Sequence, residues 1–174
     1  RGGPFASGHS SHQTGLDVDI WFRFAKPRLT PRQLADPKPY DMVNGRNDQV
    51  SSAFTTQQLT LLRLAATDNR VERIFVHPAI KLALCQQASG DRHWLQRIRP
   101  WYGHRAHLHV RLRCPTGSRD CKPQKAIPPG DGCGSELMSW FSGPTEVSST
   151  PRVRKLPQLP GRCEAMLSHR DYQS

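Results

Sequence analysis

Histidines and aspartates gather in two stretches of the sequence that are far apart along the chain. Residues 8–19 read GHSSHQTGLDVD and contain two histidines and two aspartates. Residues 104–112 read HRAHLHVRL and contain three histidines. Imidazole nitrogens and carboxylate oxygens bind transition metals and transfer protons, so these side chains could build a metal centre or an acid–base site. Either site requires structural elements that bring the two stretches together.

Each stretch predicts a β-strand with one polar and one apolar face. Polar and apolar residues alternate in the segments DVDIWF and HLHVRL. Since side chains alternate across a strand, the polar face of the first strand carries Asp17 and Asp19. The polar face of the second strand carries His107, His109 and Arg111. If the two strands are neighbours in one sheet, these polar faces lie side by side.

His12, Asp19 and His109 then form a candidate metal site. His12 precedes Asp19 across a glycine-containing turn, and His109 lies on the neighbouring strand. Two imidazoles and one carboxylate suit zinc, and a fourth position left to water is typical of catalytic rather than structural zinc. His107, two residues from a ligand, would be placed to act as general base or to stabilise the charge that develops.

The intervening sequence predicts the elements that support this sheet. Helices are expected in LTPRQLADP, where Thr30 and Gln33 form a capping box, and in FTTQQLTLLRLAATDNR, where Thr55 and Gln58 do the same. VERIFV predicts a strand, PAIKLALCQQA a helix, and DRHWLQRI a third, short helix. PYDMVNGRNDQV predicts a loop or hairpin with an Asn-Gly turn. Strands at both ends with helices between them favour an α+β fold with a central, mainly antiparallel sheet.

A chain of 174 residues is long enough for one domain with a core. We expect that domain in residues 1–143, followed in residues 144–174 by a Pro-rich linker and tail. The sequence contains no apolar run of membrane-spanning length, and it does not open on a signal peptide. We therefore expect that an earlier part of the precursor, with any targeting signal, is missing from this sequence.

The net charge and the cysteine content limit which partners the protein could bind and in which compartment it could work. The net charge of +11 favours nucleic acid, acidic lipid surfaces or carboxylate-rich polymers as partners. The absence of a recognisable nucleic-acid motif argues against the first of these. The five cysteines include no CxxC pair, and several lie beside turn residues, which favours disulfides in an oxidising compartment over a zinc ribbon. The odd number leaves one cysteine without a partner in the chain.

These residues resemble a known group of enzymes. The pattern S-x-H-x-x-G-x-x-x-D at residues 10–19, followed by H-x-H at residues 107–109, is similar to the signature of the lysostaphin, D-Ala-D-Ala metallopeptidase and Hedgehog-type fold. The segments GHSSHQTGLDVDIW, IFVHPAIK, RPWYGHRAHLHVRLRCP and GDGCG resemble one branch, the penicillin-insensitive murein endopeptidases of the Gram-negative periplasm. The resemblance runs from about residue 2 to residue 141.

The resemblance implies a zinc-dependent D,D-endopeptidase that hydrolyses D-alanyl–meso-diaminopimelyl cross-links in murein (peptidoglycan). His12, Asp19 and His109 would bind one zinc ion. His107 would be the catalytic base, and His104 a further catalytic histidine that holds the tetrahedral oxyanion. No acyl-enzyme on a serine would form, and this would explain insensitivity to penicillin.

Further residues would surround this centre. His9 would line the pocket or help to bind a second metal. The segment NGRNDQV lacks the histidine of an extra Asp/His pair that some relatives carry, so a second tight metal site is not expected. Asp17, where the wider superfamily often has a small residue, would either orient a histidine ligand or cap a turn.

Basic and aromatic residues near the two histidine stretches are candidates for substrate binding. Arg99, Arg105 and Arg111 are candidates to hold the free carboxylates of murein. Trp101 and Tyr102 would either wall the cleft or pack in the core.

The resemblance also implies disulfides Cys114–Cys121 and Cys85–Cys133, and a periplasmic location. Cys163 would bond to a cysteine upstream of residue 1.

Three alternatives remain open from the sequence. The first is a D,D- or L,D-carboxypeptidase acting on murein peptides. The second is a zinc-containing murein-binding module without catalysis, against which the presence of His107 argues. The third is a basic nucleic-acid binder. The sequence does not determine the oligomeric state.

Overall fold

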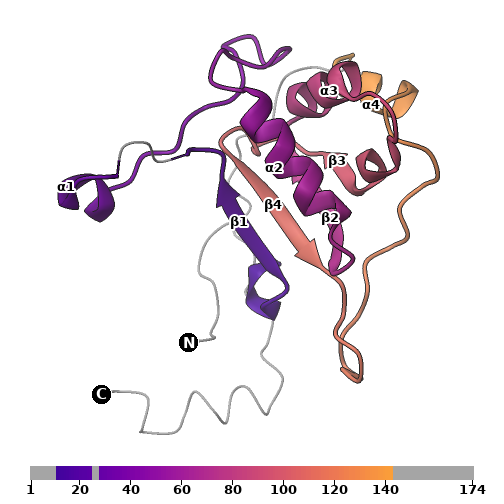
Figure 1. The fold of residues 1–174 in the computed structure, drawn as a ribbon. Helices are drawn as coiled ribbons and strands as arrows, with labels where there is room; N and C mark the ends of the chain where they lie inside the picture. Colours follow the sequence, from indigo (N-terminus) through magenta and orange to yellow (C-terminus); the bar gives the residue numbers. More distant parts are fainter. Residues whose placement is uncertain (1–10, 25–27, 143–174) are drawn as a thin grey trace, which may run out of the picture.

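The computed structural model describes residues 11–24 and 28–142 (Figure 1). His9, Cys163 and the predicted linker and tail over residues 144–174 lie outside the described residues, so the predictions made for them stay predictions. No helix among the described residues has both the length and the apolar character needed to cross a membrane.

A four-stranded mixed sheet organises the described chain. The strands β1 (Asp17–Trp21), β2 (Val71–Val76), β3 (Ile98–Pro100) and β4 (His107–Leu112) lie in the order β1-β4-β2-β3. β4 pairs antiparallel with both β1 and β2, and only β2 and β3 run parallel. The predicted α+β fold with a mainly antiparallel sheet, flanked by helices, is confirmed.

The helices start where the capping residues predict. Both α1 (Pro31–Ala35) and α2 (Thr56–Thr67) have complete capping boxes, formed by Thr30 with Gln33 and by Thr55 with Gln58. Gln58 also donates from Nε2 to the carbonyl oxygen of Phe22 at 3.0 Å, which ties the first turn of α2 to the end of β1. α3 (Pro78–Gln87) follows β2 directly.

Three elements differ from the sequence prediction. The expected helix in DRHWLQRI is a 3₁₀ helix, η2 (His93–Arg97), which runs straight into β3. β3 and the five-residue α4 (Ser135–Ser139) were not expected. Both are too short to show a hydrophobic period, and their positions depend on tertiary contacts such as the burial of Leu137.

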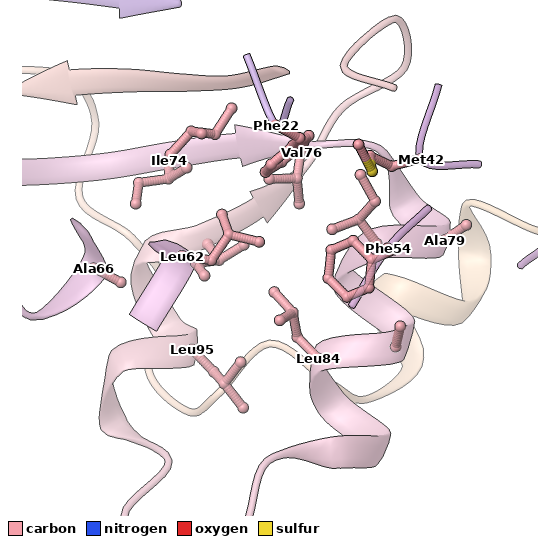
Figure 2. Packing of buried hydrophobic residues seen from close by; sticks show 14 of the residues in the cluster. Phe22, Met42, Phe54, Leu62, Ala66, Ile74, Val76, Ala79, Leu84 and Leu95 are labelled. Carbon is pink, nitrogen blue, oxygen red and sulfur yellow. The ribbon is translucent and has the colours of Figure 1, made fainter. Parts of the chain in front are cut away.

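The core lies on one face of the sheet, between the strands and the two longer helices. Figure 2 shows Ile74 of β2, Leu62 of α2 and Leu84 of α3 in one cluster of buried side chains. Leu108 and Val110 of β4 are also buried in this cluster. Because side chains alternate along β4, the histidines of this strand point to the opposite face.

The apolar face of β1 is more exposed to solvent than its sequence pattern predicts. Val18 and Ile20 are 45% and 40% exposed. β1 is an edge strand, whereas α2 lies against β2 and α3 against β3 (Figure 1).

Turns and disulfides fix the remaining segments. Val43 and Val50 form an isolated antiparallel bridge, so the predicted hairpin is present, but its loop is wider than a two-residue Asn-Gly turn. The residue with a positive φ is Asn47 (62°) rather than Gly45. The disulfides Cys85–Cys133 and Cys114–Cys121 are both present, as the resemblance implies.

Candidate active site

The pairing of β1 with β4 brings the two polar faces together. In the antiparallel register, Asp19 is opposite His109 and Asp17 is opposite Arg111. Directly opposed residues lie on the same face of a sheet, with Cβ atoms close enough for their side chains to touch. The register therefore places an aspartate and a histidine from distant parts of the chain side by side.

His12 completes a group of three possible metal ligands. It lies in η1 (His12–Thr14), which ends at Gly15 with a φ of 71°. His12 Nε2 is 3.3 Å from Asp19 Oδ2, and His109 Nδ1 is 3.1 Å from Asp19 Oδ1. One ligand atom from each of the three residues lies within 4.8 Å of the others. These atoms could surround one metal ion.

The outer nitrogens of both histidines are bonded to Asp17. His12 Nδ1 is 3.2 Å from the Asp17 carbonyl oxygen, and His109 Nε2 is 2.9 Å from Asp17 Oδ1. Both oxygens can only accept, so the neutral rings carry their protons on these outer nitrogens. Their inner nitrogens then present lone pairs to the Asp19 carboxylate. This arrangement of two imidazole nitrogens and a carboxylate is one that a metal ion can bind.

The side chain of Asp17 is itself held in place by Arg111. Its side chain is fully buried and forms an ion pair with Arg111, whose guanidinium also donates to Thr14 Oγ1 at 3.3 Å. The cation of Arg111 offsets the cost of burying this carboxylate. Of the two interpretations of Asp17, the geometry supports the one in which it orients a histidine.

We predict that Asp17→Asn lowers metal affinity by about 10- to 100-fold, the usual effect of losing an outer partner of a metal ligand. An amide binds the His109 N–H less strongly than a carboxylate and no longer balances Arg111. Competition with a chromogenic chelator measures the affinity. Asp36→Asn, which changes an exposed carboxylate, is the matched control. Equal affinity in both variants would remove Asp17 from the site.

His107 and His104 lie beside the three candidate ligands. His107 Nε2 is 3.8 Å from Asp19 Oδ1, and its ring centre is 5.0 Å from that of His104. His104 Nδ1 lies 3.3 Å from the carbonyl oxygen of Trp101 and 3.1 Å from that of Tyr102. Two carbonyl acceptors place a proton on Nδ1, so the neutral ring keeps a lone pair on Nε2. Burial, with the nearby His107, lowers the pKa of His104 and favours this neutral form.

A cavity of about 480 Å³ opens over these side chains. Trp101 and Tyr102, 55% and 37% exposed, lie on its wall. Phe75 and Gln124 also line the cavity, and the sequence did not predict a role for either residue. Phe75 is opposite His109 in the sheet register, which the sequence alone does not reveal. The lining residues are Ser11, His12, Asp19, Phe75, Trp101, Tyr102, Gly103, His104, His107, His109 and Gln124.

The three arginines proposed to bind substrate carboxylates are bound within the chain. Arg111 pairs with Asp17, as described above. Arg99 pairs with Glu136 and Arg105 with Asp41. Arg99 and Arg111 are also buried. The expectation is therefore wrong for Arg99 and Arg111, which are buried against carboxylates of the chain itself. Arg105 remains partly exposed, so the expectation for it stays a prediction.

His77 supports the turn that carries His104. Its backbone N–H donates to the His104 carbonyl oxygen at 2.9 Å, and its ring Nδ1 accepts from the Ala79 N–H at the start of α3. Burial, followed by the charge of Arg105, lowers the pKa of His77 to about 4; Asp41 partly opposes this shift.

The lowered pKa of His77 predicts a loss of stability in acid. Between pH 6.5 and about 4 the unfolded chain binds a proton on His77 that the folded chain does not. The contribution of the neutral His77 to the free energy of unfolding is therefore fully present above pH 6.5, and about 3 kcal/mol of it is lost as the pH falls to 4. His77→Asn keeps a capping side chain without a titratable ring, so its urea-unfolding free energy should fall less. The exposed His93 supplies the control, His93→Asn. A parent-like pH dependence in His77→Asn would contradict the prediction.

Comparison with known proteins relates this chain to one family. The model of the family described as "Penicillin-insensitive murein endopeptidase" matches residues 1–168. Proteins of the same name from Yersinia enterocolitica and Klebsiella pneumoniae are each 52% identical, covering 97% and 95% of the chain and 61% of each relative. The protein of that name from Pectobacterium atrosepticum is 49% identical, covering 95% of the chain and 59% of the relative. The chain thus spans about three fifths of the length of these relatives.

Proposed function

Because the chain belongs to the family of penicillin-insensitive murein endopeptidases, we propose that it is a zinc-dependent D,D-endopeptidase acting on D-alanyl–meso-diaminopimelyl cross-links of bacterial murein. The observation that carries the proposal is the convergence of His12 Nε2, Asp19 and His109 Nδ1, with Asp17 bonded to both outer nitrogens. Three protein ligands leave a fourth position open, as catalytic zinc requires.

One metal ion suffices for this proposal. When bound, zinc would polarise the scissile carbonyl and lower the pKa of a bound water. His12, Asp19 and His109 would hold the ion. Asp17 would keep both imidazoles in the tautomer that binds metal. The donor set of two imidazoles and a carboxylate is one that zinc commonly takes.

His107 is our proposed general base. It lies on the same face of β4 as His109, and its Nε2 is within 3.8 Å of Asp19. A ring in this position can accept the proton of the attacking water and deliver it to the leaving amine.

His104 has a second role that depends on its protonation. With Nδ1–H bonded to two carbonyl oxygens, its neutral ring offers only an acceptor at Nε2. The ring can donate to an oxyanion only after Nε2 is protonated. Developing negative charge on the substrate would favour that protonated form, whereas the burial of His104 disfavours it.

The two disulfides and the proposed substrate favour one cellular compartment. The two disulfides suit an oxidising environment. Together with the family's name, they support our proposal of a periplasmic protein whose partner is peptidoglycan.

Mass spectrometry of purified cross-linked muropeptide dimers tests the function. The protein is incubated with dimers and penicillin, with and without a chelator. Monomers formed only without chelator would establish a penicillin-insensitive metallo-endopeptidase and show which bond is cut. Dimers shortened by a terminal alanine would indicate a carboxypeptidase instead. Unchanged dimers in the presence of stoichiometric zinc would indicate a binding module.

A further inference from the structure

We propose that α4 is a brace for the active site, in which Trp140 positions the catalytic imidazole of His104 through Tyr102. The inference rests on the function proposed above for His104, and it adds a positioning residue outside the cavity lining. Figure 1 shows α4 beside α3, at the end of the described chain.

The segment that leads into α4 is firmly attached to the rest of the fold. The Cys85–Cys133 disulfide links it to α3. Arg92 binds the Asp131 carboxylate through Nε and Nη2, at 3.0 and 2.8 Å. The fully buried Lys81 donates from Nζ to the Asp131 carbonyl oxygen at 2.6 Å. These bonds fix the start of α4 relative to α3.

The helix itself is anchored as well. Leu137, in the middle of α4, is fully buried, and Glu136 forms an ion pair with Arg99 of β3. A five-residue helix has little stability of its own, so its position depends on these contacts. Trp140, the residue directly after α4, is therefore held in place by the contacts of the helix before it.

Trp140 contacts the turn that carries His104. Its ring centre is 4.9 Å from that of Tyr102 in an edge-on arrangement and 6.0 Å from that of Trp101. The Tyr102 hydroxyl donates to the Trp140 carbonyl oxygen. Aromatic pairs of this geometry attract each other beyond the effect of the area they bury.

The turn needs support in its middle rather than at its ends. At one end Trp101 N–H donates to the Val76 carbonyl oxygen at 2.8 Å, and at the other the His104 carbonyl accepts from His77 at 2.9 Å. Tyr102 lies between these ends, next to Gly103 with a φ of 85°. Trp140 thus holds the part of the turn that the backbone bonds to Val76 and His77 leave less constrained.

The position of this turn decides the tautomer of His104. Its Nδ1–H is bonded to the carbonyl oxygens of Trp101 and Tyr102, so a change in the shape of the turn moves both acceptors away from the ring. Nε2 would then share the proton, and the ring would lose its orientation. None of the three candidate metal ligands lies on this turn, so metal binding should not depend on Trp140.

The test compares Trp140→Ala with Trp140→Phe and with Met138→Ala. Met138 has an exposed side chain on α4, so its variant controls for general effects on the helix. With muropeptide dimers as substrate, Trp140→Ala should lower kcat about 10-fold or more while zinc content stays stoichiometric, the range seen when a partner that orients an active-site group is lost. Trp140→Phe should recover part of the loss, and Met138→Ala should match the parent.

Nitrogen-15 NMR of the histidines supplies a readout that a purely structural role would not change. In the parent, His104 should show a protonated Nδ1 and an unprotonated Nε2. In Trp140→Ala these signals should move towards a mixture of tautomers. If Trp140→Ala does not fold, Tyr102→Phe tests the second link between the two residues, because it removes the hydrogen bond to the Trp140 carbonyl oxygen and keeps the ring contact; the same NMR change is expected.

An unchanged kcat together with an unchanged His104 spectrum in a folded Trp140→Ala or Tyr102→Phe variant would overturn the proposal. The spectrum separates this failure from failure of the proposed function. If the parent cuts no muropeptide, the tautomer of His104 still reports whether α4 positions it.

Discussion

Replacing His109 by alanine should abolish metal retention and lower turnover of muropeptide dimers by about 1,000-fold or more. His109 is one of three protein ligands, and two ligands hold a divalent ion poorly. Loss of metal polarisation of the carbonyl removes several kcal/mol of transition-state stabilisation, and each 1.36 kcal/mol is tenfold in rate. Metal analysis after dialysis and the muropeptide assay measure the two effects.

His93→Ala is the matched control for this variant. His93 is exposed, starts η2 and is not among the residues that line the cavity. It should keep both metal and activity. Full zinc occupancy in folded His109→Ala would remove this residue from the ligand set, and the assignment of Asp19 and His12 would need revision with it.

Replacing His107 by alanine should leave zinc in place and reduce kcat by about 100- to 10,000-fold. This is the range that general acid–base catalysis contributes. The two variants separate binding from catalysis, because His107 and His109 are two residues apart on the same strand face and we assign them different roles. Turnover close to that of the parent in His107→Ala would exclude it as the base.

His104 variants refine the same experiment. His104→Gln keeps a side-chain N–H that can donate to an oxyanion, whereas His104→Ala does not. If His104 acts as a donor, the glutamine variant should retain more activity than the alanine variant. The opposite result would be equal impairment of the two His104 variants together with an active His107→Ala. His104, whose neutral ring has a lone pair on Nε2, would then be the better candidate for the general base.

Local patterns along the chain were sufficient for the secondary structure around the site. Alternation in DVDIWF and HLHVRL predicted β1 and β4, and the Thr-Gln pairs predicted the starts of α1 and α2. These signals depend on neighbours within a few residues, so a single sequence contains them. The short elements η2, β3 and α4 lack such a period, and their conformation depends on what they pack against.

Side-chain partners were harder to predict than elements. Arg111 was expected in the substrate groove because its type suits carboxylates, yet it is buried against Asp17. The hydrogen bond from His109 to Asp17 supports one of the two interpretations of Asp17 that the sequence left open, the one in which it orients a histidine. Both outcomes depend on the register that places residue 17 opposite residue 111.

Side-chain chemistry and the two-residue period of a strand are local properties, so the sequence alone shows which residues could bind a metal and predicts the strand faces that carry Asp19 and His109. The folded chain is needed to show which nitrogen of each histidine faces Asp19, which arginines are already paired, and which aromatic rings wall the cavity. Those properties depend on strand register and on contacts between residues far apart in the chain, such as Trp140 with Tyr102.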